Sequence, residues 1–170
     1  LAFCKGMVPN KKEKYEDARK KWLTNFDSSN VLDLKDRQIE LSKIIHNELK
    51  HFFVYSNNRA LPSVIDGLKP VQRKILCAML NKKAGTDMKV AQWAGNISEK
   101  MEYHHGEMSL NKTIAGMAQN YIGSNNINLL VPNGQFGTRE ENGKDAASPR
   151  YIFTSLEEIA QFIFHPDDLQ

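Results

Sequence analysis

The sequence predicts a mainly α-helical (α+β) fold that carries a small two-stranded β-wing. Apolar residues recur at three- and four-residue spacing in several segments after residue 35, which is typical of amphipathic helices. Two short β-prone runs, 127–131 and 150–154, come after these segments. A polar loop with glycines, 132–148, separates the two runs. We therefore expect the runs to pair as a hairpin with a long tip.

The amino-terminal third of the chain predicts a connector followed by one helix. Residues 10–26 are rich in lysine and end in aromatic residues, which predicts a connecting segment that packs through its aromatic side chains. Residues 27–35 predict a loop, since they begin with Asp-Ser-Ser-Asn. A helix is predicted over 36–55 and is expected to end at the polar run 56–59. The residues expected on its apolar face are Leu41, Ile44, Ile45, Leu49, Phe52 and Phe53.

Three further helices are predicted over 70–81, 88–101 and 107–122. With the hairpin after them, they have the layout of a winged helix-turn-helix domain, which binds duplex DNA with one helix in the major groove and the wing along the backbone. The run 155–158 matches a capping box and predicts a last helix. The residues expected to face the core are Val71, Ile75, Leu76, Met79, Val90, Trp93, Ala94, Ile97, Met101, Leu110, Ile114, Met117, Ala118, Tyr121, Ile159, Ala160 and Ile163.

Charge is distributed unevenly along the chain. All 23 Lys and Arg residues precede residue 151, and four of the 20 acidic residues lie in 151–170, so residues 1–150 carry a formal charge of +7. A basic body with an acidic tail favours a polyanionic partner. The alternative is a solvated surface whose charge is simply uneven.

Composition favours a globular protein from a reducing compartment. Hydrophobic residues make up 41% of the chain and charged residues 25%, which is typical of soluble domains. No apolar run reaches the ~18 residues that a membrane span needs, so no membrane partner is expected. Cys4 and Cys77 lie far apart and predict neither a disulfide framework nor a cysteine-rich zinc site. Because the chain has no initiator Met and no signal peptide, we expect it to be a piece of a longer protein.

The loop 132–148 and the dipeptide after it are suited to phosphate chemistry. Glycines let backbone amides approach phosphates, and Arg139 and Lys144 add positive charge. A tyrosine phenol, whose pKa is about 10, attacks phosphorus when a base takes its proton and cations stabilise the developing charge. Tyr151 could be that nucleophile, with Arg150 beside it as the cation. The alternative is an aromatic strand residue beside a surface arginine.

A second candidate site, Tyr103, His104 and His105, precedes the predicted helix 107–122. Free amides at a helix N-terminus favour phosphate, and histidines could donate hydrogen bonds to it or move a proton. No third ligand lies nearby in sequence, so no metal site is predicted. Tyr103 competes with Tyr151 as the nucleophile, and the residues alone do not choose between them. A basic cluster at another helix start could bind phosphate or be a solvated turn, and it comprises Lys69, Arg73 and Lys74.

A series of short motifs runs along the chain. They are Leu-Ala-Phe (1–3), RKKWLTNF (19–26), LPSVIDGLKP (61–70), QRK (72–74), KVAQ (89–92), YHHGEMSL (103–110), AQN (118–120), GSNN (123–126), GQFGTR (134–139), GKD (143–145) and SPRYIFT (148–154). Together, in this order, they resemble type II DNA topoisomerases of the eukaryotic kind, which some large DNA viruses also encode. The resemblance is dense over 59–166 and looser over 1–26, whereas 27–58 matches mainly as a helix.

The resemblance implies a domain organisation. Residues 1–26 would be the end of a metal-binding (TOPRIM-like) domain and a connector, and 27–58 a linker and helix. Residues 59–166 would form the winged-helix DNA-cleavage domain, and 167–170 would start the next domain. The parent enzyme would use Mg²⁺ and ATP, both bound outside this chain, which has neither the acidic metal-binding cluster nor the ATPase motifs of the family. The isolated fragment is therefore expected to bind DNA weakly and to cleave it poorly or not at all.

The resemblance also implies a role for each candidate residue. Tyr151 would form a transient 5′-phosphotyrosyl link, one per subunit of a homodimer and on opposite strands, and another duplex would pass through the double-strand break. Arg150 would stabilise the transition state. His105 and Arg73 would contact the region of the scissile phosphate, with His104 in support. The residues expected to bind the double-stranded DNA are Lys69, Lys89, Tyr103, Ser109, Arg139 and Lys144.

Two residues depart from the family pattern. Val71 and Asn142 stand where the family usually has glycine, so we expect an ordinary φ at Val71 and a tolerated positive φ at Asn142.

The resemblance implies a nuclear location, or alternatively a viral replication site in the host cytoplasm. A non-catalytic winged-helix DNA-binding module is the main alternative function. A module that only dimerises subunits is another, although the basic charge argues against that as its sole role.

Overall fold

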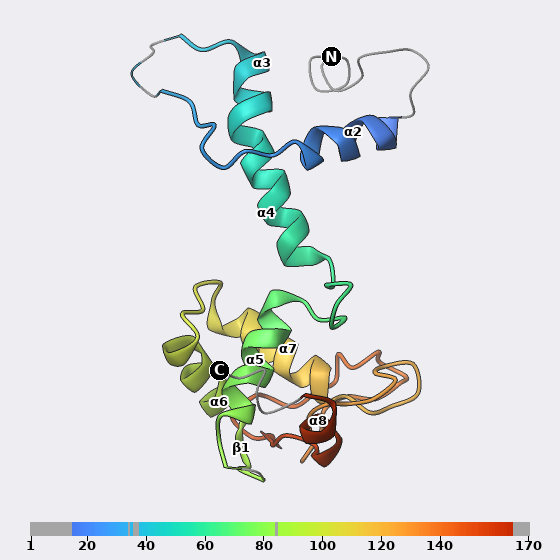
Figure 1. The fold of residues 1–170 in the computed structure, drawn as a ribbon. Helices are drawn as coiled ribbons and strands as arrows, with labels where there is room; N and C mark the ends of the chain where they lie inside the picture. The colour runs from blue at the N-terminus through green and yellow to red at the C-terminus, as the bar shows by residue number, and fades with distance from the viewer. Residues whose placement is uncertain (1–14, 34, 36–37, 84, 165–170) are drawn as a thin grey trace. The chain divides into compact units, whose positions relative to one another are not determined.

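The structure is a computed structural model that describes residues 15–33, 35, 38–83 and 85–164. The chain divides into two compact units, Leu1–Ile65 and Asp66–Gln170. Helices dominate, and a two-stranded antiparallel sheet lies in the second unit (Figure 1). The predicted mainly helical α+β class is therefore confirmed. The sequence expectations for 1–14 and 165–170 lie outside the described residues.

In the first unit, the predicted connector contains a helix, α2 (Tyr15–Thr24). The aromatic residues of the connector pack as expected. The Trp22 ring meets Phe53 edge-on with its centroid 6.0 Å away, and Phe26 meets His51 at 4.9 Å. The sequence pattern missed α2 because charged residues dominate it and few apolar residues mark a face. Its acidic first turn and basic last turn do suit the helix dipole.

A second helical stretch of the first unit runs from residue 41 to residue 60. It consists of α3 (Leu41–Lys43), the π-helical segment η1 (Ile44–Leu49) and α4 (Lys50–Ala60). The predicted bounds of 36–55 are therefore wrong, and the polar run 56–59 lies inside α4. The stretch ends because Leu61 precedes a proline and adopts extended angles, φ −90° and ψ 135°. A proline disfavours helical angles in the residue before it.

The predicted apolar face of this stretch is only partly buried. Ile45 is 6% exposed, whereas Leu41, Ile44 and Phe52 are 62%, 38% and 59% exposed. A π-helical turn holds more residues than an α-helical turn, so three- and four-residue spacing no longer stays on one side of the helix. The prediction of one continuous inward face is therefore wrong.

The second unit contains the three predicted helices, α5 (Pro70–Leu80), α6 (Val90–Lys100) and α7 (Glu107–Ala118). The bounds agree with the prediction within two residues, except that α7 ends before residue 122. Gln119 leaves the helical region with φ −58° and ψ 131°. The side-chain amide of Asn125 then donates to the carbonyls of Gly116 and Gln119, at 2.7 and 2.8 Å, in place of a further helical turn.

Side chains of α5, α6 and α7 form one core with the segments that follow them. Trp93 is 1% exposed, and its indole Nε1 donates to the carbonyl of Thr154 at 2.8 Å. The Thr154 hydroxyl in turn donates to the carbonyl of Val131 at 2.8 Å. Buried hydrogen bonds of this kind link the helices to the segments around the sheet. The predicted core residues confirmed as buried are Ile75, Leu76, Met79, Val90, Trp93, Ala94, Ile97, Leu110, Ile114, Met117, Ala118 and Ala160.

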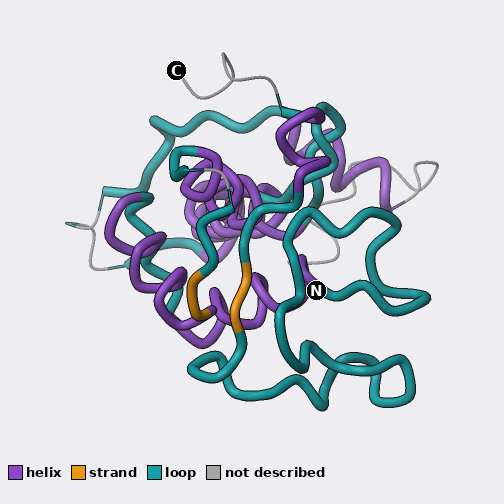
Figure 2. Tube along the Cα trace, turned by 90° about the horizontal axis from the view of Figure 1, so that it is seen from below, coloured by secondary structure: helices purple, strands orange, loops and turns teal. Residues whose placement is uncertain are grey.

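The sheet pairs two strands that differ from the predicted ones. Strand β1 (Met88–Lys89) lies antiparallel to β2 (Phe153–Thr154) (Figure 2). The predicted hairpin between 127–131 and 150–154 is therefore wrong, and β2 begins only at residue 153. Two residues are too few to show alternation, and β1 leads directly into α6, so the sequence pattern placed it in the helix 88–101.

The segment before the loop follows the other side of β2 without forming a strand there. Isolated bridges pair Leu130 with Leu156 and Asn133 with Phe153. The backbone amide of Val131 also donates to a carbonyl across this edge, that of Ser155, at 2.9 Å. The predicted neighbourhood of the two runs is thus present, but its hydrogen bonding is irregular.

The last described helix is α8 (Glu158–Ile163). The predicted capping box is wrong, because the N-cap is Glu157 and no side chain caps it. The carbonyl of Ser155 instead accepts the amide of Val131 in the extended segment before the helix. Of the residues expected to face inward, Ile159 and Ile163 are 42% and 50% exposed. No described helix is long and apolar enough to cross a membrane.

We expect Thr154→Val to lower the free energy of unfolding by about 1–3 kcal/mol, because it removes the donor of the fully buried Thr154 side chain from the partly buried carbonyl of Val131. Thr113→Val is a matched control, since the Thr113 hydroxyl donates to Ser109 on an exposed helix surface. The control should change stability by less than about 0.5 kcal/mol. Urea unfolding followed by tryptophan fluorescence measures both, and equal effects would contradict the account of the core.

Candidate functional site

The dipeptide Arg150–Tyr151 lies in a turn that binds the N-terminus of α6. The amide of Val90 donates to the carbonyl of Ile152 at 3.0 Å, and the amide of Ala91 donates to the carbonyl of Pro149 at 3.1 Å. The first amides of a helix have no partner inside the helix, so these two are free to hold an external segment. The carbonyls on either side of Arg150–Tyr151 are therefore fixed, while the two side chains are not enclosed.

The Tyr151 side chain is 66% exposed. The prediction that it opens a strand is wrong, because its amide donates to the carbonyl of Ser148 at 2.8 Å and closes a turn before β2. The Arg150 guanidinium carbon lies 5.0 Å from the centroid of the Tyr151 ring, within range of a cation–π contact. A phenol and a cation thus share one exposed turn.

Lys89 adds a second positive charge near this turn. It is the N-cap of α6, and its backbone amide donates to Gln92 Oε1 at 3.2 Å. Its ammonium nitrogen lies 5.9 Å from the ring centroid of Phe153, which pairs with Lys89 across the sheet and follows Tyr151 by two residues. The side chain therefore stays beside β2.

The second candidate cluster lies at the start of α7, as predicted. Gly106 is the N-cap with φ 85°, and His104 and His105 before it are exposed. The rings of Tyr103 and His105 meet edge-on, with centroids 5.6 Å apart. Tyr103 packs partly against the core, so its phenol is less accessible than that of Tyr151. Ser109 is exposed in the first turn of α7.

The three cations of the predicted basic cluster at the start of α5 lie in different environments. Lys74 extends to the end of α6, where its ammonium donates to the carbonyls of Met101 and Glu102 at 2.7 and 3.4 Å. Such a cation stabilises the negative end of a helix dipole. Lys69 is the N-cap of α5, and its backbone amide donates to Gln72 Oε1 at 2.8 Å. Lys74 is thus part of the scaffold, and Lys69 holds a helix start.

Arg73 pairs with Asp66 in a two-pronged ion pair. Arg73 Nε lies 2.6 Å from Asp66 Oδ2, and Nη2 lies 2.9 Å from Oδ1. These hydrogen bonds from Arg73, followed by one from the amide of Leu68, lower the pKa of Asp66 from 3.8 to about 2. The bonds use Nε and Nη2, so the two N–H groups of Nη1 remain available for another acceptor.

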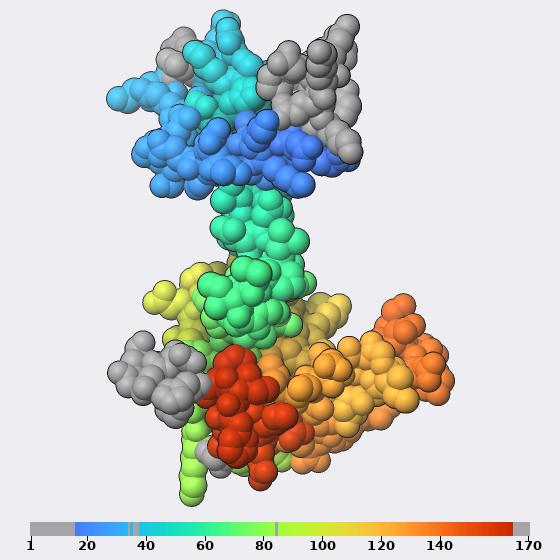
Figure 3. Space-filling view, turned by 45° about the vertical axis from the view of Figure 1, so that its right-hand side comes forward, coloured from blue at the N-terminus to red at the C-terminus, as the bar shows by residue number. Residues whose placement is uncertain are grey.

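The loop 132–148 forms a closed wing that projects from the body of the second unit (Figure 3). The Asp145 carboxylate accepts the amide of Thr138 at 2.8 Å, and this bond lowers the pKa of Asp145. The amide of Gly143 donates to the carbonyl of Thr138 at 2.9 Å, and Phe136 is 4% exposed. Asn142 has φ 51°, so the expected positive φ is confirmed. Arg139 and Lys144 are exposed on the wing.

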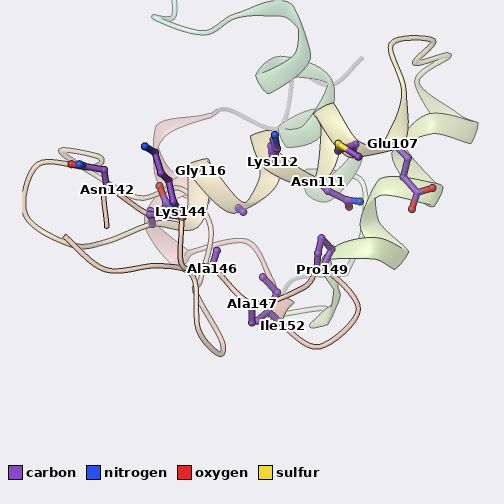
Figure 4. A pocket seen from close by; sticks show the side chains of 14 residues that line it. Glu107, Asn111, Lys112, Gly116, Asn142, Lys144, Ala146, Ala147, Pro149 and Ile152 are labelled. Carbon is purple, nitrogen blue, oxygen red and sulfur yellow. The ribbon is translucent and has the colours of Figure 1, made fainter. Parts of the chain in front are cut away.

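A groove of about 810 Å³ lies between α7 and residues 142–149, which form the return arm of the wing. Glu107, Asn111 and Lys112 line it from α7, while Lys144 and Pro149 line it from the arm (Figure 4). The groove thus reaches the residue just before the Arg150–Tyr151 turn. The carbonyl oxygen of the Asn111 side chain is buried and has no hydrogen-bond partner.

Sequence reasoning missed several of these features. Lys112 and Asn111 lie one turn along α7 from Met108 and Glu107, so their spacing could have identified them once the helix start was known. Asp66 carried no signal, because it lies outside α5 and seven residues before its partner Arg73, which is inside that helix. Among the residues that the structure describes, no group of three or more His, Cys, Asp or Glu residues could hold a metal ion.

Comparison with known proteins identifies the family. The family model described as DNA gyrase/topoisomerase IV matches residues 59–170. The chain belongs to the type II DNA topoisomerases. DNA topoisomerase 2 of Arabidopsis thaliana is 51% identical over 168 residues, and that of Saccharomyces cerevisiae is 49% identical over 168 residues. Each comparison covers 99% of this chain but 11% of the relative, so the chain spans about a ninth of the curated topoisomerases that it matches.

A solved topoisomerase structure has the same fold. It is the DNA-binding, cleavage and re-ligation domain of Plasmodium falciparum topoisomerase II, which is 45% identical and superposes with a TM-score of 0.70. The superposition covers 85% of this chain and 20% of that one. The topoisomerase resemblance drawn from the motifs is therefore confirmed.

Gly137→Ala tests the closure of the wing. Gly137 has φ 104°, and a Cβ there would lie 2.5 Å from Gly143 Cα, so we expect a loss of about 1–3 kcal/mol in the free energy of unfolding. Gly95→Ala in α6 is the matched control, since its Cβ would meet nothing within 4 Å. The control should gain about 0.5–1 kcal/mol. Chemical denaturation measures both, and a gain in both variants would contradict the described wing.

The Asp66–Arg73 pair predicts a pH dependence. Because the folded pKa of Asp66 is lower than that of the unfolded chain, the pair contributes stability above pH about 4 that is lost as the pH falls towards about 2. The stability difference between the wild type and Asp66→Asn should therefore shrink across this window. An NMR titration of the Asp66 carboxyl measures the pKa directly, and a midpoint at the ordinary value of 3.8 would contradict the pairing.

Proposed function

We propose that this chain is the DNA breakage-reunion part of an ATP-dependent type II topoisomerase and that Tyr151 is its nucleophile. The observation that carries the proposal is the exposed Arg150–Tyr151 turn, held by its flanking carbonyls at the N-terminus of α6. Membership of the topoisomerase family supports it. The alternative nucleophile, Tyr103, packs partly against the core and contacts His105.

In the proposed reaction the Tyr151 phenol oxygen attacks a DNA phosphorus. A bond forms from that oxygen to phosphorus, the bond from phosphorus to the 3′ oxygen breaks, and the strand end leaves as a 3′ hydroxyl. The phenol proton passes to a base, and the product is a 5′-phosphotyrosyl link. The Arg150 guanidinium, next to the ring, stabilises the charge that develops on the phosphate. Religation is the same step in reverse.

The remaining candidates have supporting roles in this proposal. Arg73, oriented by Asp66, offers its free Nη1 to the region of the scissile phosphate. His105 contacts the same region, with His104 in support. The start of α7 and the wing bind the duplex on either side of the groove. The proposed DNA-binding residues are Lys69, Lys89, Tyr103, Ser109, Arg139 and Lys144.

The Mg²⁺ and ATP of the parent enzyme are proposed to bind outside this chain. The described residues do not fit a metal ion, since no group of three or more of their His, Cys, Asp and Glu side chains could hold one. No step of the reaction above is therefore assigned to a metal on this chain. The partner of the chain is double-stranded DNA, and the parent acts as a homodimer that breaks both strands. We propose a nuclear location, with a viral replication site in the host cytoplasm as the alternative.

A non-catalytic winged-helix DNA-binding module is the second candidate function. The groove and the exposed cations of the wing favour DNA binding without requiring cleavage. The two candidates differ in what they require of Tyr151, since a binding module has no need of an exposed phenol beside an arginine.

Tyr151→Phe in the full-length parent enzyme tests the proposal. We expect the covalent protein–DNA adduct to fall by at least about a thousandfold, as when other covalent nucleophiles are removed, while DNA affinity is kept. Tyr103→Phe is the matched control and should retain the adduct. Loss of the adduct in Tyr103→Phe instead would move the nucleophile to Tyr103. A wild-type enzyme that binds DNA but never forms an adduct would favour the binding module.

A further inference from the structure

Gln119 lies where α7 ends and faces both arms of the wing. Its side-chain nitrogen donates to the carbonyl of Phe136 at 2.9 Å and approaches the carbonyl of Gly143 at 3.4 Å. Its side-chain oxygen accepts the hydroxyl of Tyr121 at 3.3 Å. Phe136 lies on the outgoing arm of the wing and Gly143 on the return arm. One amide group therefore ties both arms to the end of α7.

The fit around this amide leaves no spare room. A Cβ placed on Gly143 would meet the Gln119 nitrogen and would lie 2.8 Å from the Tyr121 hydroxyl. A Cβ on Gly137 would lie 2.5 Å from Gly143 Cα. Three close approaches thus converge at the base of the wing. At Gly137 the obstacle to a side chain is the backbone of Gly143, whereas at Gly143 it is the ends of the Gln119 and Tyr121 side chains, which a new Cβ would displace.

The wing has other bonds that keep it folded without Gln119. Asp145 accepts the Thr138 amide, Gly143 donates to the Thr138 carbonyl, and Phe136 is buried. The Gln119 amide adds a hydrogen bond from the end of α7 to the contact that buried Phe136 already makes with the core. Its loss should therefore change how the wing sits against α7 more than whether the wing folds.

We propose that Gln119 is a positioning residue that fixes the wing against α7. In this position the side chains of Arg139 and Lys144 contact the phosphates of a DNA duplex bound along the groove. Lys144 lines the groove next to Gly143, whose carbonyl faces Gln119. A wing held at one angle places its cations against the backbone, whereas a loose wing loses part of that contact. This proposal rests on the DNA-binding role proposed above and concerns a residue with no assigned part in the chemistry.

The salt dependence of DNA affinity separates positioning from general destabilisation. Each phosphate contact contributes about one unit to the slope of log affinity against log salt concentration. If Gln119 acts through the two wing cations, Gln119→Met in the full-length enzyme should reduce the magnitude of that slope by up to about two. Gln119→Met keeps a similar length and the same charge while it removes the donor.

The test uses a double-mutant comparison on a DNA duplex. Gln119→Met should weaken binding in the wild-type background but have no further effect when Arg139→Ala and Lys144→Ala are present. Tyr121→Phe is the matched control, since it removes only the hydroxyl that Gln119 accepts and leaves both wing carbonyls bound. It should leave the salt slope unchanged.

Two outcomes would overturn the positioning role. One is an unchanged salt slope in Gln119→Met, and the other is an equal loss of affinity with and without the wing cations. The readout is DNA binding and not cleavage, so the result is independent of which tyrosine is the nucleophile. A wild-type enzyme without salt-dependent DNA binding would instead contradict the proposed function itself.

Discussion

The backbone amides at the start of α6 hold the turn that carries Tyr151, and the rest of the second unit supports that contact. The amides of Val90 and Ala91 bind the carbonyls on either side of Arg150–Tyr151. One turn further along α6, Trp93 donates to Thr154 from within the core. The same helix therefore fixes the chain before and after the exposed phenol. A fixed backbone on both sides would help the proposed nucleophile reach one phosphorus atom in the correct geometry.

Two further elements define the surroundings of this turn. The start of α7 brings Tyr103 and His105 together, and the wing brings Lys144 to the other side of the groove. The groove extends to Pro149, whose carbonyl is bound by α6. The proposed DNA surface and the proposed nucleophile thus share one contiguous scaffold, and a shift of α6 would displace both.

The helices of the second unit could be predicted because their apolar spacing reflects real burial, as at Trp93 and Ile97. The positive φ of Asn142 could be predicted because the family that the motifs resemble usually has glycine there and asparagine tolerates that conformation. The pairing of β2 with β1 could not be predicted, since a two-residue strand shows no alternation of apolar and polar residues. The Asp66–Arg73 pair could not either, because it depends on how a loop folds back onto a helix.

The candidate site, too, could be predicted only in part. Local chemistry left Tyr103 and Tyr151 open, and the ordered motifs favoured Tyr151 through their resemblance to topoisomerases. The motifs do not show which backbone amides bind the turn, or which side chain connects the wing to α7. These contacts join residues far apart in sequence, such as Gln119 and Phe136, so they follow from the packing of the whole unit.

The most direct test of the central claim is to identify the residue that carries DNA after cleavage. The full-length enzyme would be trapped on a duplex, the protein and DNA digested, and the peptide that retains a nucleotide sequenced by mass spectrometry. The account predicts a 5′-linked nucleotide on the Tyr151 oxygen, in the peptide that contains Arg150–Tyr151. A nucleotide on Tyr103, or on any other residue, would contradict it.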